Sequence, residues 1–160
     1  MTLMASAVSL TVNGRTVSVR SDHAHLLAAL REELDITSPK DGCAPSGQCG
    51  ACTVLLDGKA IQSCLVSMEK AAGKAVTTLE GFDEAERDRL ATAFAVTGAL
   101  QCGFCTPGIL LTLVSFLEEN PHPTEDQIRH ALSGNLCRCT GYQHIVEAVQ
   151  HAAELMSNSK

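Results

Sequence analysis

Cysteine is the residue that most constrains this chain, because eight cysteines stand among its 160 residues. They fall into two sets of four along the sequence: Cys43, Cys49, Cys52 and Cys64 in the first, and Cys102, Cys105, Cys137 and Cys139 in the second. Disulfides belong mainly to secreted chains, and the N-terminus lacks the basic stretch and apolar core of a secretory signal. We therefore expect a cytoplasmic protein whose cysteines form two four-thiolate metal sites.

The spacing within each set bears on which metal the thiolates bind. Structural zinc sites favour a Cys-x2-Cys pair at both ends, and neither set contains two such pairs. The first set has three cysteines in one loop, with five and then two residues between them, and a fourth cysteine after eleven more. That pattern is close to the plant-type [2Fe–2S] spacing. Gly42, Gly47 and Gly50 suit such a loop, because glycine permits tight turns and a close approach of backbone N–H groups to the cluster.

The first half of the chain has the pattern of a small α+β unit. Alternating polar and apolar residues predict strands, a leucine stripe predicts a helix, and Asn-Gly and Asp-Gly predict hairpin turns. In chain order these are strand 8–12, turn 13–14, strand 16–20, helix 23–34, strand 53–56, turn 57–58 and strand 75–79. A unit of the β-grasp kind, as in plant-type ferredoxins, is therefore expected over residues 1–82.

The second half, residues 83–160, changes to helical periodicity and predicts an all-α domain of four helices. These helices are expected at 83–97, 107–119, 124–134 and 140–156, with Pro107 at the first position of the second and capping boxes at 124–127 and 140–143. The two cysteine pairs of this half precede the second and fourth helices. Two helix starts brought together would form a four-thiolate site, where their positive dipole ends favour an anionic cluster. The fold class is thus α+β, a β-grasp domain followed by a four-helix domain.

Composition excludes several other classes of protein. The net charge of −6 argues against a phosphate backbone as partner, and an aromatic content of 3% argues against a stacking platform for single-stranded nucleic acid. Apolar runs are too short to span a membrane. None of the six histidines has a convincing ligand spacing to a cysteine, so we expect surface or helix-capping roles for them.

Motifs around the cysteines are specific enough to indicate a family. They are CGACTV at 49–54, QCGFCTPG at 101–108 and GNLCRCTGY at 134–142. With them the chain resembles the small iron–sulfur subunit of the xanthine oxidase family of molybdenum hydroxylases. Similar chains include the small subunits of aerobic carbon monoxide dehydrogenase and of bacterial N-heterocycle and aldehyde oxidoreductases. The resemblance extends over nearly the whole chain, from about Val8 to Leu155.

The resemblance implies a role for each cysteine set and for one glutamine. The first set would hold a [2Fe–2S] cluster nearer a flavin, and the second a [2Fe–2S] cluster nearer molybdenum. Gln101 would lie against a pterin as a hydrogen-bonding amide, and Cys139, itself a cluster ligand, would approach the pterin amino group. The chain would carry no substrate chemistry and would pass electrons one at a time toward the flavin.

The same resemblance implies partner chains. A large subunit would hold molybdopterin cytosine dinucleotide, a medium subunit would hold FAD, and the assembly would be a dimer of heterotrimers. Three alternatives stay open: an enzyme without a flavin subunit that passes electrons to a cytochrome, a free-standing ferredoxin, and a zinc-stabilised interaction module. The substrate is not written in this chain, since its pocket would lie on another polypeptide.

One departure from the family pattern concerns the first loop. The family usually has four residues between the first two ligands, whereas five residues lie between Cys43 and Cys49. We expect Pro45 and Gly47 to form a local bulge that absorbs the extra residue.

Overall fold

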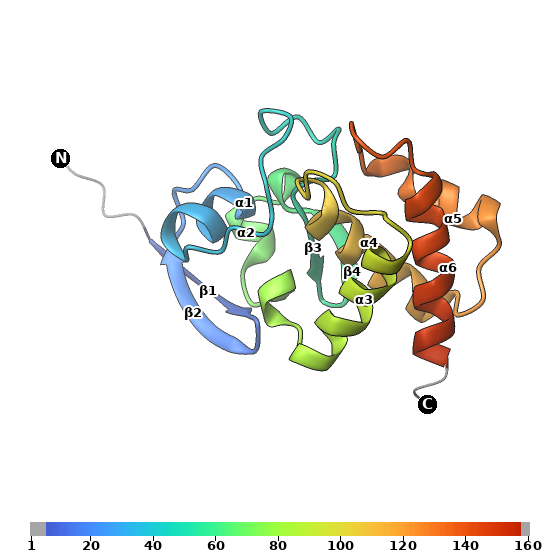
Figure 1. Cartoon of the computed structure of the whole chain (residues 1–160). Helices are drawn as coiled ribbons and strands as arrows, with labels where there is room; N and C mark the ends of the chain where they lie inside the picture. The colour runs from blue at the N-terminus through green and yellow to red at the C-terminus, as the bar shows by residue number, and fades with distance from the viewer. Residues whose placement is uncertain (1–5, 158–160) are drawn as a thin grey trace.

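A computed structural model describes residues 6–157 and shows a mixed sheet with helices packed beside it (Figure 1). Within these residues the sheet has five strands in the order β2-β1-β5-β3-β4. They are β1 Ala7–Val12, β2 Arg15–Arg20, β3 Thr53–Leu56, β4 Lys59–Gln62 and β5 Ala75–Thr77. β1 and β5 are parallel, and the other neighbouring strands are antiparallel. Two hairpins joined through β5 thus make the β-grasp sheet that the sequence predicted.

Both predicted hairpin turns are confirmed. Asn13 and Gly14 have φ angles of 50° and 77°, and Asp57 and Gly58 have φ angles of 50° and 82°. Two successive positive φ angles match the right-handed twist of the flanking strands, which is why Asn-Gly and Asp-Gly favour such turns. The second turn leads into β4, a strand that the sequence pattern did not predict.

The core of this first unit lies between the sheet and short helices. Apolar side chains of the strands, among them Leu10, Val19, Val54 and Val76, are buried against Leu26, Leu30 and Met68. Burial of each large aliphatic side chain contributes about 1.5–3 kcal/mol. The short helical segments of this unit are α1 Leu26–Ala28, the 3-10 turn Ser63–Leu65, α2 Met68–Ala71 and the 3-10 turn Leu79–Gly81.

The helix predicted over 23–34 is shorter than expected and changes type. α1 begins after His25, whose Nδ1 accepts a hydrogen bond from the Ala28 N–H at 3.0 Å, so the expected capping role of this histidine is confirmed. From Ala29 to Glu33 the segment is a π-helix, in which the Leu34 N–H reaches the Ala29 carbonyl at 3.2 Å.

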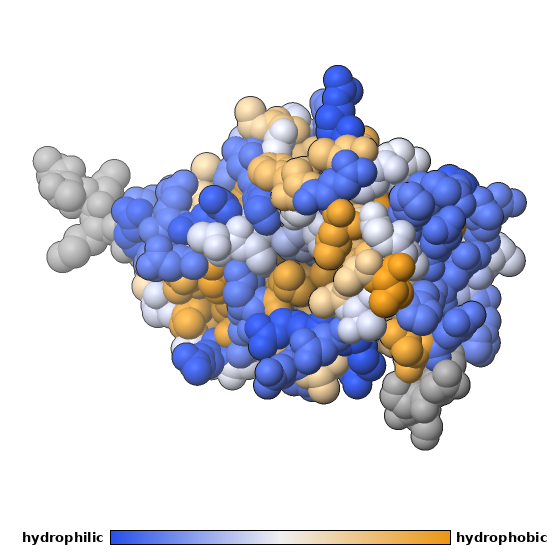
Figure 2. All heavy atoms as spheres, viewed as in Figure 1, coloured by the Kyte–Doolittle hydropathy of each residue, from blue (hydrophilic) through white to orange (hydrophobic). Residues whose placement is uncertain are grey.

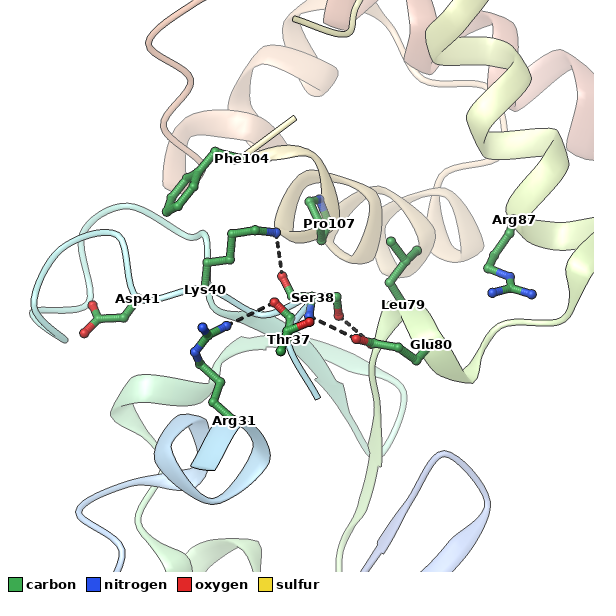
Figure 3. Close-up of a pocket in the computed structure, with 10 residues that line it drawn as sticks. All are labelled: Arg31, Thr37, Ser38, Lys40, Asp41, Leu79, Glu80, Arg87, Phe104 and Pro107. Carbon is green, nitrogen blue, oxygen red and sulfur yellow. Dashed lines mark hydrogen bonds between the residues drawn. The ribbon is translucent and has the colours of Figure 1, made fainter. Parts of the chain in front are cut away.

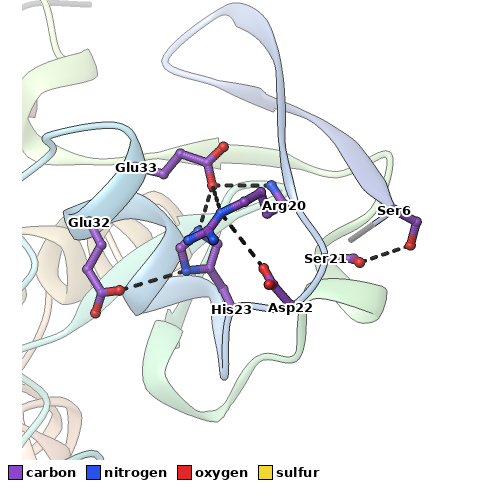
Figure 4. Close-up of polar contacts among 7 residues, drawn as sticks. All are labelled: Ser6, Arg20, Ser21, Asp22, His23, Glu32 and Glu33. Carbon is purple, nitrogen blue, oxygen red and sulfur yellow. Dashed lines mark hydrogen bonds and ion pairs between the residues drawn. The ribbon is translucent and has the colours of Figure 1, made fainter. Parts of the chain in front are cut away.

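The expectation of a surface or capping role is wrong for His23. Its side chain is only 3% exposed, and its Nε2 lies 2.6 Å from Glu33 Oε2 (Figure 4). Its Nδ1 faces the Glu32 carboxylate at 3.9 Å, and the Glu33 carboxylate also accepts a hydrogen bond from the Arg20 N–H at 3.2 Å. This cluster joins the end of β2 to the π-helix.

Four helices longer than one turn make up the second half of the described chain, as predicted. They are α3 Glu84–Val96, α4 Thr106–Glu119, α5 Glu125–Ala131 and α6 Gln143–Ser157. α4 is the central helix, because its apolar face packs against the other helices and also against β3 (Figure 1). Leu55 of the sheet and Phe82 belong to the same buried cluster as Ile109 and Leu113. One hydrophobic core therefore includes residues from both halves of the chain.

Helix capping agrees with the sequence at one predicted box and differs at the other. Thr124 and Gln127 form the expected reciprocal hydrogen bonds at the start of α5. The box predicted at Thr140 and Gln143 is wrong, because α6 begins only at Gln143 and the Gln143 side chain contacts Arg129 and Glu147 instead. The Thr140 hydroxyl faces the second cysteine site, as described below.

No helix within residues 6–157 has the length and apolar composition that crossing a membrane requires. The face shown in Figure 2 is mostly polar, with apolar residues gathered near its centre.

Candidate iron–sulfur sites

The first cysteine loop connects the π-helix to β3 and begins with a tight turn. The Ser46 N–H donates to the Cys43 carbonyl at 3.2 Å, and the Ser46 hydroxyl donates to the same oxygen at 2.7 Å. Ala44 has a φ of 52° within this turn, and Gly47 follows with a φ of 68°. The loop thus leaves the ordinary backbone regions at Ala44 and again at Gly47, on either side of Pro45. The expected bulge at Pro45 and Gly47 stays a prediction.

Two thiols of this loop lie next to each other and receive backbone donors. The pKa of Cys43 is lowered to about 6, chiefly by the neighbouring Ser46 hydroxyl and then by the Gln48 and Cys49 N–H groups, which donate to its sulfur. The Cys49 thiol lies beside it. Burial raises the pKa of Cys49, against a hydrogen bond from the Ala51 N–H. The expected amides aimed at sulfur are thus present.

The other two thiols of the first set form a second pair in a more buried place. Cys52 and Cys64 are 2% and 6% exposed. Burial, and then the neighbouring Cys52 thiol, raises the pKa of Cys64 to about 12, while the Gly47 N–H donates to its sulfur. Iron bound here would replace the thiol protons, because the thiolate is the form that binds a metal.

Two glycines of this loop suit it for different reasons. A Cβ on Gly42 would lie 2.9 Å from Cys49 Sγ and 3.1 Å from Cε1 of Phe104, so space is short there. Gly47 has a φ of 68°, a backbone conformation that favours glycine. The loop therefore wraps closely around its thiols, as a cluster-binding loop must.

The second set of cysteines also lies as two pairs. Cys102 and Cys139 are exposed at the surface with their sulfurs 3.4 Å apart. Cys105 and Cys137 are more buried and neighbour each other; burial, and then the Cys137 thiol, raises the pKa of Cys105 to about 12. The Cys102 pKa is lowered because the Phe104 N–H donates to its sulfur.

The helix-start prediction is correct for one of the two helices. Cys105 is the residue immediately before α4, so the positive end of that helix lies at the site. α6 begins four residues after Cys139, and the intervening loop supplies donors of its own. The Thr140 hydroxyl lies 3.1 Å from Cys137 Sγ, and with the Thr140 and Cys139 N–H groups it lowers the Cys137 pKa against the opposing effect of burial.

Tyr142 holds the loop of the second site in place, a role that sequence reasoning missed. Its hydroxyl donates to the Asn135 carbonyl at 2.8 Å and accepts from the Cys137 N–H at 2.7 Å. The signal was present, because this is the chain's one tyrosine and it closes the cysteine motif.

The arrangement of the thiols fits two-iron clusters. Each site presents two pairs of thiols, and a [2Fe–2S] cluster bound by four cysteines takes two on each iron. No three His, Cys, Asp or Glu side chains among the described residues are arranged to hold a single metal ion. The two thiol pairs would each ligate one iron of a cluster, and the N–H groups directed at sulfur would stabilise its negative charge.

Gln101, Cys102 and Cys139 lie together in sequence or space on the exposed side of the second site. Leu136, next to Cys137, is 57% exposed. Phe104, next to Cys105, is 46% exposed, and its ring faces Lys40 and Gly42 of the first loop.

A groove of about 680 Å³ separates the first loop from the start of α4 (Figure 3). It is lined by Arg31, Thr37, Ser38, Lys40, Asp41, Leu79, Glu80, Arg87, Phe104 and Pro107. The Lys40 ammonium lies 5.7 Å from the centre of the Phe104 ring and donates to the Ser38 carbonyl at 3.1 Å. The Arg31 guanidinium is likewise occupied by the Thr37 and Pro39 carbonyls, so these cations serve to hold the loop.

Comparison with known families agrees with this division of the sites. Residues 10–79 match the family of 2Fe-2S iron-sulfur cluster binding domains, and residues 78–150 match a second family of [2Fe-2S] binding domains. The fold and its two cysteine sites thus define a protein with two iron–sulfur domains.

Individual relatives narrow this class further. The chain is 42% identical to the nicotinate dehydrogenase small FeS subunit of Eubacterium barkeri, over 94% of this chain and 97% of the relative. It is 45% identical to the nicotine 6-hydroxylase small subunit of Paenarthrobacter nicotinovorans, over 94% and 92%. A chain in the crystal structure of quinoline 2-oxidoreductase from Pseudomonas putida 86 superposes with a TM-score of 0.88 at 42% identity, covering 98% of both chains. The protein belongs to the small iron–sulfur subunits of the xanthine oxidase family of molybdenum hydroxylases.

Proposed function

We propose that this chain is the electron relay of a molybdenum hydroxylase, carrying electrons from a molybdopterin centre on a large subunit to FAD on a medium subunit. The observation that carries the proposal is the presence of two thiol sites, each of paired cysteines, in one polypeptide. A [2Fe–2S] cluster at each site would supply reversible one-electron chemistry. Membership of the family supports electron transfer as the role of the chain. The transfer to FAD on a medium subunit is the further part of the proposal.

The cysteine ligands are assigned by site. Cys43, Cys49, Cys52 and Cys64 would hold the cluster nearer the flavin, and Cys102, Cys105, Cys137 and Cys139 the cluster nearer molybdenum. The polypeptide contributes backbone N–H donors to the sulfurs, burial that excludes water, and glycines that allow close wrapping. We propose the boundary between the two domains at residues 82 and 83; the passage from β5 and its following 3-10 turn to α3 supports it.

Gln101 and Cys139 are assigned to the contact with the pterin. Gln101 is exposed, and Cys139 lies at the surface against Cys102, so both are accessible to a partner chain. The amide of Gln101 would orient the pterin, and Cys139 would bring a cluster ligand close to it.

Partner composition is the direct test. The chain, purified from its native source under anaerobic conditions, should co-purify with a molybdopterin chain and an FAD chain, and we propose a dimer of such heterotrimers. Molybdenum without flavin would indicate the two-subunit arrangement that reduces a cytochrome. Isolation of the chain alone, with neither cofactor chain, would instead favour a free-standing ferredoxin.

Eight free thiols and their metal role fit a cytoplasmic location, which cell fractionation would test.

Gln101→Ala tests the pterin contact within the assembled enzyme. Reduction of the clusters by substrate should slow more than reduction by dithionite, because dithionite bypasses the pterin. Substrates to screen are N-heterocycles of the kind for which the relatives are named, nicotinate among them. Gln150→Ala, an exposed glutamine on α6, is the matched control and should leave both rates unchanged. Equal slowing of both reductions by Gln101→Ala would remove the assignment.

A further inference from the structure

The two cysteine sites are joined at one place by a backbone hydrogen bond. The Leu136 N–H donates to the Cys49 carbonyl at 2.8 Å. Cys49 belongs to the first site, and Leu136 is bonded directly to Cys137 of the second. A continuous route of covalent bonds, interrupted by one short hydrogen bond, therefore leads from a thiol of one site to a thiol of the other.

The surroundings of this hydrogen bond hold the two segments rigidly. Asn135 is 4% exposed, its Nδ2 donates to the Gly50 carbonyl at 3.2 Å, and its Oδ1 accepts from the Thr112 hydroxyl at 3.0 Å. A Cβ on Gly50 would lie 2.3 Å from the Gly134 carbonyl, and a Cβ on Gly108 would lie 2.3 Å from the Gly50 carbonyl. Both glycines permit a backbone contact that no other residue allows.

The two sites also approach each other at Phe104, the residue before Cys105. Phe104 Cε1 and Cys49 Sγ lie 3.1 and 2.9 Å from the place that a Cβ on Gly42 would take. Electronic coupling falls off more steeply across a gap between non-bonded atoms than along covalent or hydrogen bonds, so we expect the Leu136 route to couple the sites more strongly.

We propose that the Leu136 N–H to Cys49 carbonyl hydrogen bond is the main electronic link between the two sites. The proposal rests on the proposed function, because it requires a cluster at each site. With a cluster bound at each site, one electron would pass from the reduced cluster to the oxidised one, and no bond would form or break.

Leu136→Pro removes the N–H donor and is compared with Leu136→Ala, which keeps it and loses only an exposed side chain. Asn135 has φ −120° and ψ 109°, a conformation that a residue before proline adopts readily. Replacing the Leu136 amide by an ester removes the same donor without a ring, and serves if the proline variant fails to bind both clusters. Phe104→Leu tests the competing contact.

The experiment uses the complete enzyme with one electron injected by a photoreduced flavin. Freeze-quench EPR follows the redistribution of the electron between the two cluster signals, and a redox titration of each variant checks that the potentials still allow the transfer. Redistribution should be several-fold slower in the proline or ester variant and unchanged in Leu136→Ala and Phe104→Leu. A wild-type rate without the N–H donor, or equal slowing by Phe104→Leu, would overturn the proposal. Absence of two cluster signals in the wild-type enzyme would instead refute the proposed function.

Discussion

Gly50 lies where the two cysteine sites meet, and we expect a side chain there to destabilise the fold. Its φ of 68° lies in the left-handed region, where a Cβ costs about 1–2 kcal/mol. That Cβ would also lie 2.3 Å from the Gly134 carbonyl and 2.6 Å from Asn135 Nδ2. Neither neighbour is the free end of a flexible side chain, so overpacking adds about 1–3 kcal/mol.

Gly50→Ala should therefore lower the free energy of unfolding by about 2–5 kcal/mol. Gly58→Ala is the matched control, because Gly58 has a φ of 82° and no atom lies within 4 Å of the place that its Cβ would take. Gly58→Ala should lower the free energy of unfolding only by the cost of the left-handed backbone conformation, about 1–2 kcal/mol. Urea unfolding of the cluster-loaded chains, followed by circular dichroism together with loss of the cluster absorbance, measures both. Equal losses in the two variants would show that the close approach at Gly50 does not constrain the fold.

Other predictions concern the ligands, the first loop and the acid response. Cys49→Ser should remove mainly one [2Fe–2S] EPR signal and Cys105→Ser mainly the other; loss of both signals in either folded variant would contradict two separate sites. Ala44→Gly should raise the free energy of unfolding by up to about 1 kcal/mol, because Ala44 has a φ of 52°, and a decrease would argue against this turn. The pKa of Glu33 lies below its usual range, chiefly because His23 hydrogen-bonds its carboxylate. A lowered folded-state pKa stabilises the fold above the unfolded-state pKa, and this contribution is lost as pH falls through the folded-state pKa. The stability difference between wild type and Glu33→Gln should accordingly shrink on acidification, whereas a constant difference would refute the contact.

Local sequence signals predicted those elements whose causes are local. Asn13 and Asp57 each precede glycine, and both turns have the expected left-handed backbone. The helix cap at Thr124 was also predictable, because its partner Gln127 is only three residues away in the sequence. β4 escaped prediction because a four-residue strand with one strongly apolar side chain, Ile61, carries almost no periodic signal.

Features that depend on tertiary packing could not be predicted in this way. Thr140 has the sequence of a cap but faces Cys137, because the loop of the second site continues to Gln143 before the helix begins. The burial of His23 depends on the docking of the π-helix against β2. Spacing divided the cysteines into two sets, but the pairing within each set follows from the folded loops. The same holds for the contact between Leu136 and Cys49, which are far apart in sequence.

Two iron–sulfur clusters on two separate cysteine sets give this chain a metal content that can be measured. Metal analysis of the anaerobically purified protein, combined with a reductive EPR titration, determines both the number and the kind of centres. We expect about four iron atoms per chain, no stoichiometric zinc, and two distinguishable [2Fe–2S] signals that appear on reduction. Zinc in place of iron, or about two iron atoms with a single signal, would contradict this expectation.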